Sequence, residues 1–175
     1  MTPAQEIANA LSMFLPTLVL AYHSANSGNS WVFLLLLGAC MHLPVSFTYH
    51  LSVAWGRYAD RIDNDMRRLD QTLQHVVSTL YSYVLSQGST GYMLLNLAIN
   101  ARGVARLWDP RTSNDGRRWQ AIFVSGVFYM LPVLAGGKVL HFLSAFLAFL
   151  LGGTAAFVFN GSGYGSLVLH LLMAV

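Results

Sequence analysis

Long apolar runs separated by short polar connections make up most of the chain. Seven such stretches can be argued, at about residues 7–23, 31–55, 69–86, 91–108, 119–134, 139–159 and 164–175. A helix rises about 1.5 Å per residue, so roughly 20 apolar residues cross the hydrocarbon core of a bilayer. The pattern therefore predicts an all-α, polytopic membrane protein, with one domain over residues 1–175 and about seven transmembrane helices.

Two of these stretches differ from the rest. The stretch at 69–86 carries Asp70, Gln71, Gln74 and His75. Ionisable and amide groups are expensive in contact with lipid, so we expect this helix to lie inside the bundle. The stretch at 164–175 is short and ends with the chain, and we expect it either to be truncated in the bilayer or to be completed by a partner.

The composition agrees with a lipid-facing surface. Only 10% of the residues are charged and the mean hydropathy is +0.50, whereas about a quarter of the residues of a soluble domain are charged. The first residues contain no basic region and no cleavage motif, so the first stretch is predicted to be a retained helix and not a removed signal peptide.

The charged residues predict a topology, because they gather in two connections, 56–68 and 109–118. The arginines within or beside these connections are Arg57, Arg61, Arg67, Arg68, Arg106, Arg111, Arg117 and Arg118. Alternation of seven helices puts both connections on one side, which the positive-inside rule assigns to the cytoplasm or the mitochondrial matrix. The N-terminus is then inside and the C-terminus outside. Since these arginines report topology, no nucleic-acid partner is predicted.

Three ionisable groups from separate helices fall at a similar depth. His50, Asp70 and His170 all lie within roughly 10 Å of the predicted inner surface, counted by helix rise. Neutral imidazole and carboxylate are the usual zinc ligands, and a catalytic zinc keeps one position open for a water that it activates. Ser46 lies four residues from His50, and Ser166 four residues from His170, so each pair shares a helix face. The spacing suggests a zinc site near the arginine-rich side.

Other interpretations of these residues stay open. A single intramembrane histidine or asparagine is often an interhelical hydrogen-bonding group. Asp70 follows two arginines, so it also fits a surface ion pair near a helix start. His42 lies two turns from His50, too far to share a metal with it, and His75 lies on a different face from Asp70, where packing or a polar relay is expected.

Three motifs together resemble the haemolysin III family, which belongs with the progestin and adipoQ receptors and the alkaline ceramidases. They are Ser46-Phe-Thr-Tyr-His50, then Arg67-Arg68-Leu69-Asp70, then residues 163–172 around His170. The family pattern is Ser-x-x-x-His, then Asp, then His-x-x-x-His on the last core helix. The resemblance runs from about residue 40 to the end. It implies a seven-helix bundle that binds zinc, with His50 and His170 as ligands, Asp70 orienting the metal's water and Ser46 supporting it.

The sequence departs from the family pattern at one position, and this departure changes the function that we expect. Ser166 stands at the position of the first histidine of the last motif, and a hydroxyl does not replace imidazole as an ordinary zinc ligand. The resemblance then implies a degenerate zinc-hydrolase site in a non-catalytic structural or accessory subunit of a membrane assembly. Two alternatives are a zinc-dependent hydrolase of a lipid amide, which would be ceramidase-like, and a lipid-binding receptor. The expected partners are membrane lipids and other membrane-protein subunits.

Overall fold

The computed structural model describes residues 2–60, 63–109, 111 and 115–158, and all regular structure in these residues is helical. The helices are α1 (Pro3–Ser12), α2 (Phe14–Ser27), α3 (Ser30–Ala54), α4 (Asp65–Leu85), α5 (Thr90–Leu107), α6 (Asp115–Ala135) and α7 (Val139–Val158). The all-α class is confirmed, and a helix covers each of the first six predicted stretches. The predicted seventh helix at 164–175 lies outside the described residues.

Local capping groups explain where several helices begin. Before α3, the side chain of Asn29 accepts a hydrogen bond from the backbone N–H of Trp31 at 2.9 Å. Before α4, Asn64 caps the N–H of Arg67 in the same way at 2.8 Å. Side-chain oxygens at these positions satisfy backbone donors that have no partner within the helix. The short polar connections therefore stop one helix and start the next.

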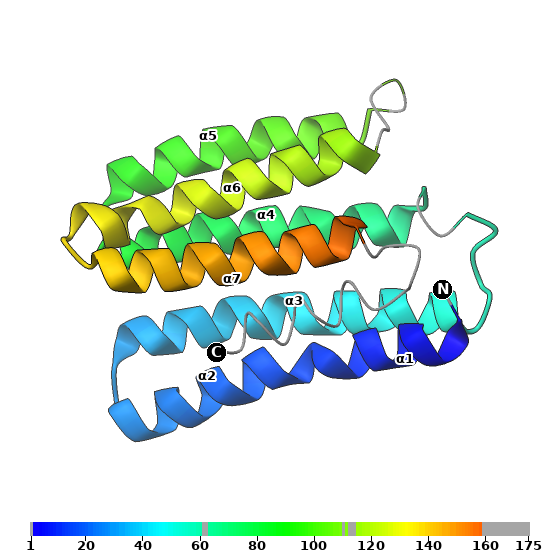
Figure 1. The fold of residues 1–175 in the computed structure, drawn as a ribbon, viewed down its shortest axis with the longest axis horizontal. Helices are drawn as coiled ribbons and strands as arrows, with labels where there is room; N and C mark the ends of the chain where they lie inside the picture. Colours follow the sequence, from blue (N-terminus) through cyan, green and yellow to red (C-terminus); the bar gives the residue numbers. More distant parts are fainter. Residues whose placement is uncertain (1, 61–62, 110, 112–114, 159–175) are drawn as a thin grey trace.

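The first predicted span, over 7–23, corresponds to two successive helices, α1 and α2, which together form one apolar segment over Pro3–Ser27. α1 ends at Ser12 and α2 starts at Phe14, with Met13 between them. Pro16 has no backbone N–H, and its ring clashes with the carbonyl four residues earlier, which belongs to Ser12. The helix therefore breaks at the residue where this clash falls, although α1 and α2 continue along the bundle in nearly the same direction (Figure 1).

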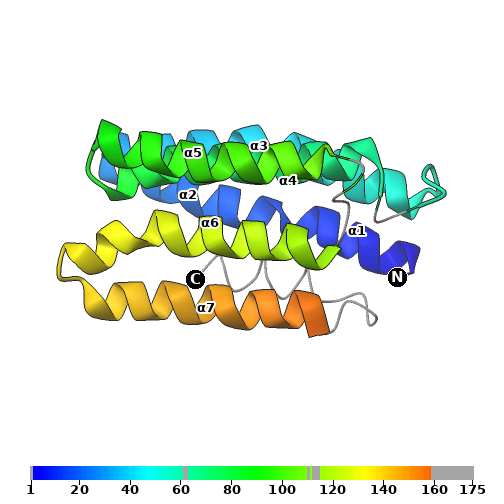
Figure 2. The ribbon, with the colours of Figure 1, turned by 90° about the horizontal axis from the view of Figure 1, so that it is seen from above.

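α4 lies in the middle of the bundle, where it packs against α3, α5 and α6. α1 and α2 pack against α3, while α7 packs on α6. Figure 2 shows α3, α4 and α5 in one layer, with α6 and then α7 on one side of it. The buried residues of α4 include Asp70, Gln71, His75 and Ser78, so the predicted interior position of this polar helix is confirmed.

The bundle has its polar residues inside and its apolar residues outside. In the described part of the chain, fifteen buried residues are polar or charged and seven are hydrophobic. Of the side chains that the structure describes, twenty-five large hydrophobic ones are exposed, among them Leu18 at 62% and Leu140 at 78%. A water-soluble domain shows the reverse, because burial of apolar area is its main stabilising contribution.

Among the described residues, two segments are long and apolar enough to cross a membrane. They are Pro3–Ser27, which comprises α1 and α2, and Ser30–Ala54, which is α3, with mean hydropathies of 1.2 and 1.8. Only 11% of the most apolar window of α3 is buried. The core helix of a soluble protein has the same composition but is mostly buried, so this exposure distinguishes α3 from such a helix.

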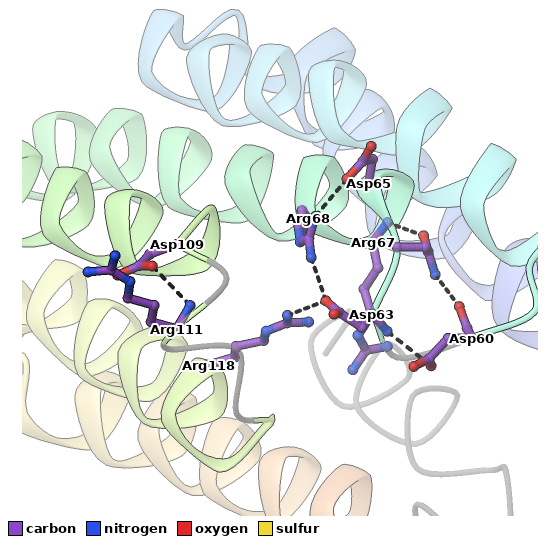
Figure 3. A network of polar contacts seen from close by, with 9 residues as sticks. Asp60, Asp63, Asp65, Arg67, Arg68, Asp109, Arg111 and Arg118 are labelled. Atoms are coloured by element: carbon purple, nitrogen blue, oxygen red, sulfur yellow. Dashed lines mark hydrogen bonds and ion pairs between the residues drawn. The ribbon is translucent and has the colours of Figure 1, made fainter.

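The two arginine-rich connections meet at one end of the bundle (Figure 3). The Asp63 carboxylate, in the connection between α3 and α4, accepts hydrogen bonds from Arg68 at 2.7 Å and from Arg118 at 2.8 Å. Arg68 also donates to Asp65 at 2.7 Å. Since Arg118 lies in the first turn of α6, these contacts join both connections, as the alternation of helices predicts.

Candidate functional site

Three of the predicted site residues, Ser46, His50 and Asp70, belong to a largely buried group that we call the histidine–carboxylate cluster, together with Glu6 and His42. Its first contact joins α1 to α3, where His50 Nδ1 lies 2.7 Å from a carboxylate oxygen of Glu6. Glu6 is 1% exposed and His50 is 7% exposed. With Glu6 ionised, Nδ1 carries the proton and donates, because a carboxylate only accepts. The other ring nitrogen, Nε2, then presents its lone pair.

The second contact of the cluster joins α3 to α4. His42 Nε2 lies 2.9 Å from the Asp70 carboxylate, and the Ser46 hydroxyl also interacts with this carboxylate. Asp70 is buried, at 6% exposed, and its partner is a histidine, so its interpretation as a surface ion pair with arginine is wrong. His42 lies too far along α3 to share a metal with His50, yet it contacts the residue expected to orient the metal's water.

Asn9 adds an amide next to the cluster. Along the chain, Asn9 lies between Glu6, which contacts His50, and Phe14 at the start of α2, whose ring packs edge-on against Phe47. Asn9 is fully buried, and neither atom of its carboxamide has a hydrogen-bond partner among the described residues. A buried carboxamide group usually forms at least one hydrogen bond.

The described residues do not by themselves complete a metal centre. No group of three or more His, Cys, Asp or Glu side chains converges among them. A structural or catalytic zinc needs at least three protein ligands. Within residues 2–158, the family pattern assigns only His50 as a ligand and Asp70 beside it. The other predicted positions, Ser166 and His170, lie outside the described residues.

A second polar group, the amide network, joins α4, α5 and α6. The side-chain oxygen of Asn100 accepts hydrogen bonds from His75 Nδ1 at 2.7 Å and from the Ser125 hydroxyl at 2.6 Å. Its amide nitrogen donates to Thr79 at 3.0 Å and to Asn96. His75 is therefore a hydrogen-bonded packing residue on a different face from Asp70, as its position in the sequence predicts. Interhelical hydrogen bonds of this kind hold helices together where apolar burial does not.

A cavity of about 180 Å³ lies between the two polar groups. Its residues come from α2, α3, α4, α6 and α7, and from Met13 between α1 and α2. His42 contributes from the histidine–carboxylate cluster, and His75, Ser78 and Ser125 contribute from the amide network. The rest of the lining is mainly apolar. A cavity with a mostly apolar wall and a few polar groups suits an amphipathic small molecule.

Comparison of the chain with known protein families, with curated proteins and with solved structures gives no match. What the site does is therefore inferred from its own contacts. Among these, the roles of Glu6 and Asn9 are absent from the sequence interpretation. A signal was present, because Glu6 is the only acidic residue before Asp60 and Asn9 follows it on the same face of an apolar helix.

Proposed function

We propose that the chain is an integral membrane protein whose arginine-rich end faces the cytoplasm or the matrix. The inverted distribution of polar and apolar residues supports this, because lipid favours an apolar exterior. The single end that carries both arginine-rich connections supports the orientation. α1 starts at that same end (Figure 1), which corresponds to an N-terminus inside. A C-terminus outside requires one further crossing after α7.

Extraction and labelling test this assignment. The chain should remain in the membrane pellet at alkaline pH and dissolve only in detergent. In a Cys40→Ser background, the cysteine introduced by Arg111→Cys should react with a membrane-impermeant maleimide only after the membrane is permeabilised. Before that, the reagent cannot reach the inner side. A cysteine at Lys138, in the turn between α6 and α7, should react from the outer side. A chain that enters the alkaline supernatant contradicts the membrane assignment.

For the histidine–carboxylate cluster we propose a structural role, as a degenerate zinc-hydrolase site in a subunit of a membrane assembly. The observation that supports it is the pairing of each described site residue with a protein group. His50 is held by Glu6, and Asp70 is held by His42. These pairs give each buried carboxylate a hydrogen-bond partner and join α1 to α3 and α3 to α4. With Ser166 in place of a histidine, the predicted zinc sphere is also one ligand short.

Metal analysis of the purified full chain separates this proposal from catalysis. A degenerate site retains little zinc, and the content does not change in His50→Ala. Stoichiometric zinc that is lost in His50→Ala contradicts the degenerate site. Purification under mild detergent should also recover a fixed set of membrane proteins in constant ratio, and recovery of the chain alone from its native membrane contradicts the subunit role.

One observation favours the zinc-dependent hydrolase of a lipid amide as a second candidate. Metal-binding histidines usually donate their other ring N–H to a carboxylate, which orients the ring. Glu6 contacts His50 in this way and leaves Nε2 for a ligand. In that function, His50 and His170 hold zinc and Asp70 positions the attacking water. Release of fatty acid from a ceramide, lost in both Asp70→Asn and His50→Ala, would support it.

The cavity favours a lipid-binding receptor as a third candidate. Its apolar wall accommodates an acyl chain, while His42, Gln74 and His75 offer polar contacts for a head group. In this function the metal-free protein should bind a lipid. Ser125→Leu, on the wall of the cavity, should weaken that binding. Equal binding by the parent and the variant argues against it.

A further inference from the structure

A second, smaller cavity of about 20 Å³ lies between α4, α5 and α6. Its wall includes two residues of α4, two of α5 and one of α6, which are Gln71, His75, Gly103, Arg106 and Arg118. A cavity needs roughly 10–15 Å³ to hold one water molecule. This cavity therefore has room for a single water molecule or for one ion of similar size.

Gln71 provides a hydrogen-bond acceptor at this cavity. The residue is 4% exposed, and its side-chain oxygen Oε1 is buried without a hydrogen-bond partner among the described residues. Most buried side-chain polar atoms form a hydrogen bond, because an unsatisfied acceptor keeps the free-energy cost of its lost hydration. Since Gln71 lines the cavity, a hydrogen-bond donor bound there would satisfy this oxygen.

The amide network determines which ring nitrogen of His75 carries the proton. The Thr79 hydroxyl donates to the backbone carbonyl of His75 at 3.1 Å, so the Thr79 oxygen accepts the 3.0 Å hydrogen bond from the amide nitrogen of Asn100. The other amide atom of Asn100, Oδ1, then faces His75 and accepts from Nδ1–H at 2.7 Å. A neutral imidazole with its proton on Nδ1 has a lone pair on Nε2. His75 therefore provides a second acceptor.

Gly103 places this second acceptor beside the small cavity. A Cβ added to Gly103 would lie 3.0 Å from Nε2 of His75 and 3.4 Å from Nδ1, so Nε2 is the ring nitrogen nearer to the glycine. Gly103 lines the small cavity, whereas the lining of the 180 Å³ cavity includes no residue of α5. Gln71 and His75 lie four residues apart and share one face of α4. Both acceptors therefore border the small cavity, and the missing side chain of Gly103 keeps it open.

The charge and the hydrogen-bonding groups of the wall favour water over an ion. Arg106 and Arg118 line the cavity, and their positive charge disfavours a cation. A halide ion has no hydrogen-bond donor, so it would leave both acceptors unsatisfied. A water molecule has two O–H donors, one for Oε1 of Gln71 and one for Nε2 of His75. Its oxygen is also compatible with the positive charge of the arginines.

We propose that the small cavity binds one water molecule, which donates hydrogen bonds to Oε1 of Gln71 and to Nε2 of His75. Buried waters with two or more polar partners of this kind are part of a protein's structure and are costly to remove. The water extends the amide network from His75 toward the arginine-rich end, where Arg118 contacts Asp63. The site involves no residue of the histidine–carboxylate cluster, and it does not rest on the membrane assignment.

High-resolution diffraction from crystals of the full chain, with and without a sodium bromide soak, tests the site. We expect one peak of the size of a water molecule at about 2.5–3.2 Å from both Gln71 Oε1 and His75 Nε2, without anomalous signal from bromide. Gln71→Met keeps the length of the side chain but removes the acceptor, so the peak should be lost. Gln74→Met makes the same change on the same helix at the 180 Å³ cavity, and it should leave the peak unchanged.

The remaining outcomes decide against the water site. Ordered side chains of Gln71 and His75 with no peak between them overturn it, and so does a direct hydrogen bond between the two side chains. An anomalous bromide peak in the cavity shows an anion site and also overturns it. A peak that keeps its full height in Gln71→Met shows that this acceptor does not hold the water. If Gln71→Met does not fold, the density in crystals of the parent chain decides alone.

Discussion

Replacing Glu6 with alanine removes the acceptor that holds His50 inside the bundle. The two groups are 2.7 Å apart, and they are 1% and 7% exposed, so bulk water does not take the place of the lost carboxylate. An unsatisfied buried polar group costs about 1–3 kcal/mol. For a chain of this size, each kcal/mol lowers the melting temperature by about 2–4 °C. We therefore expect a decrease of about 2–12 °C, measured by thermal unfolding of the purified protein in detergent.

Two further variants show whether the loss belongs to this contact. Glu6→Gln has the same length and keeps one carbonyl oxygen for Nδ1–H, so its loss should be the smaller one. In a double-mutant cycle of Glu6→Ala with His50→Ala, residues in direct contact should be coupled by about 0.5–3 kcal/mol. An unchanged melting temperature in Glu6→Ala, or strictly additive losses in the cycle, would refute the conclusion that the contact of Glu6 with His50 stabilises the packing of α1 on α3.

Three other changes test contacts elsewhere in the bundle by the same unfolding assay. A Cβ on Gly103 would lie 2.8 Å from Cε1 of the His75 ring, so Gly103→Ala should destabilise by about 1–3 kcal/mol through overpacking, and an unaffected protein contradicts this packing. Asn100→Leu removes the acceptor of His75 Nδ1 and should cost about 1–3 kcal/mol; no loss means that the amide network does not stabilise the fold. Asp63→Asn weakens partly exposed ion pairs with Arg118 and Arg68, so its loss should stay below about 1 kcal/mol and shrink further in high salt, whereas a salt-independent loss argues against an ionic origin.

The apolar runs predicted where the helices lie, because the length of a run and its hydropathy are local properties. The polar residues of the stretch at 69–86 also predicted that this helix lies inside the bundle. The break at Met13 could have been read from Pro16, whose effect on the carbonyl of Ser12 is equally local. The contacts of the site were harder to predict from the sequence, because they depend on how separate helices face one another.

The level of Asp70 in the bundle illustrates the difficulty. α4 begins at Asp65, four residues before the predicted start, so Asp70 lies more than a turn inside the helix. Arg67 contacts Tyr49, next to His50 on α3, whereas Asp70, three residues further along α4, contacts His42. A shift of one helical turn thus changed the partner of Asp70. The contact of Glu6 with His50 spans 44 residues, and no spacing rule relates residues that far apart.

The central claim is that the histidine–carboxylate cluster holds the helices together without a metal. A diffraction experiment on crystals of the full chain, with data collected on both sides of the zinc absorption edge, tests it most directly. We predict no anomalous peak between His50 and Asp70, and Glu6 and His42 as the partners of these two residues. An anomalous peak at about 2.0–2.1 Å from His50 Nε2, the usual zinc–nitrogen distance, would contradict the claim and favour a working hydrolase.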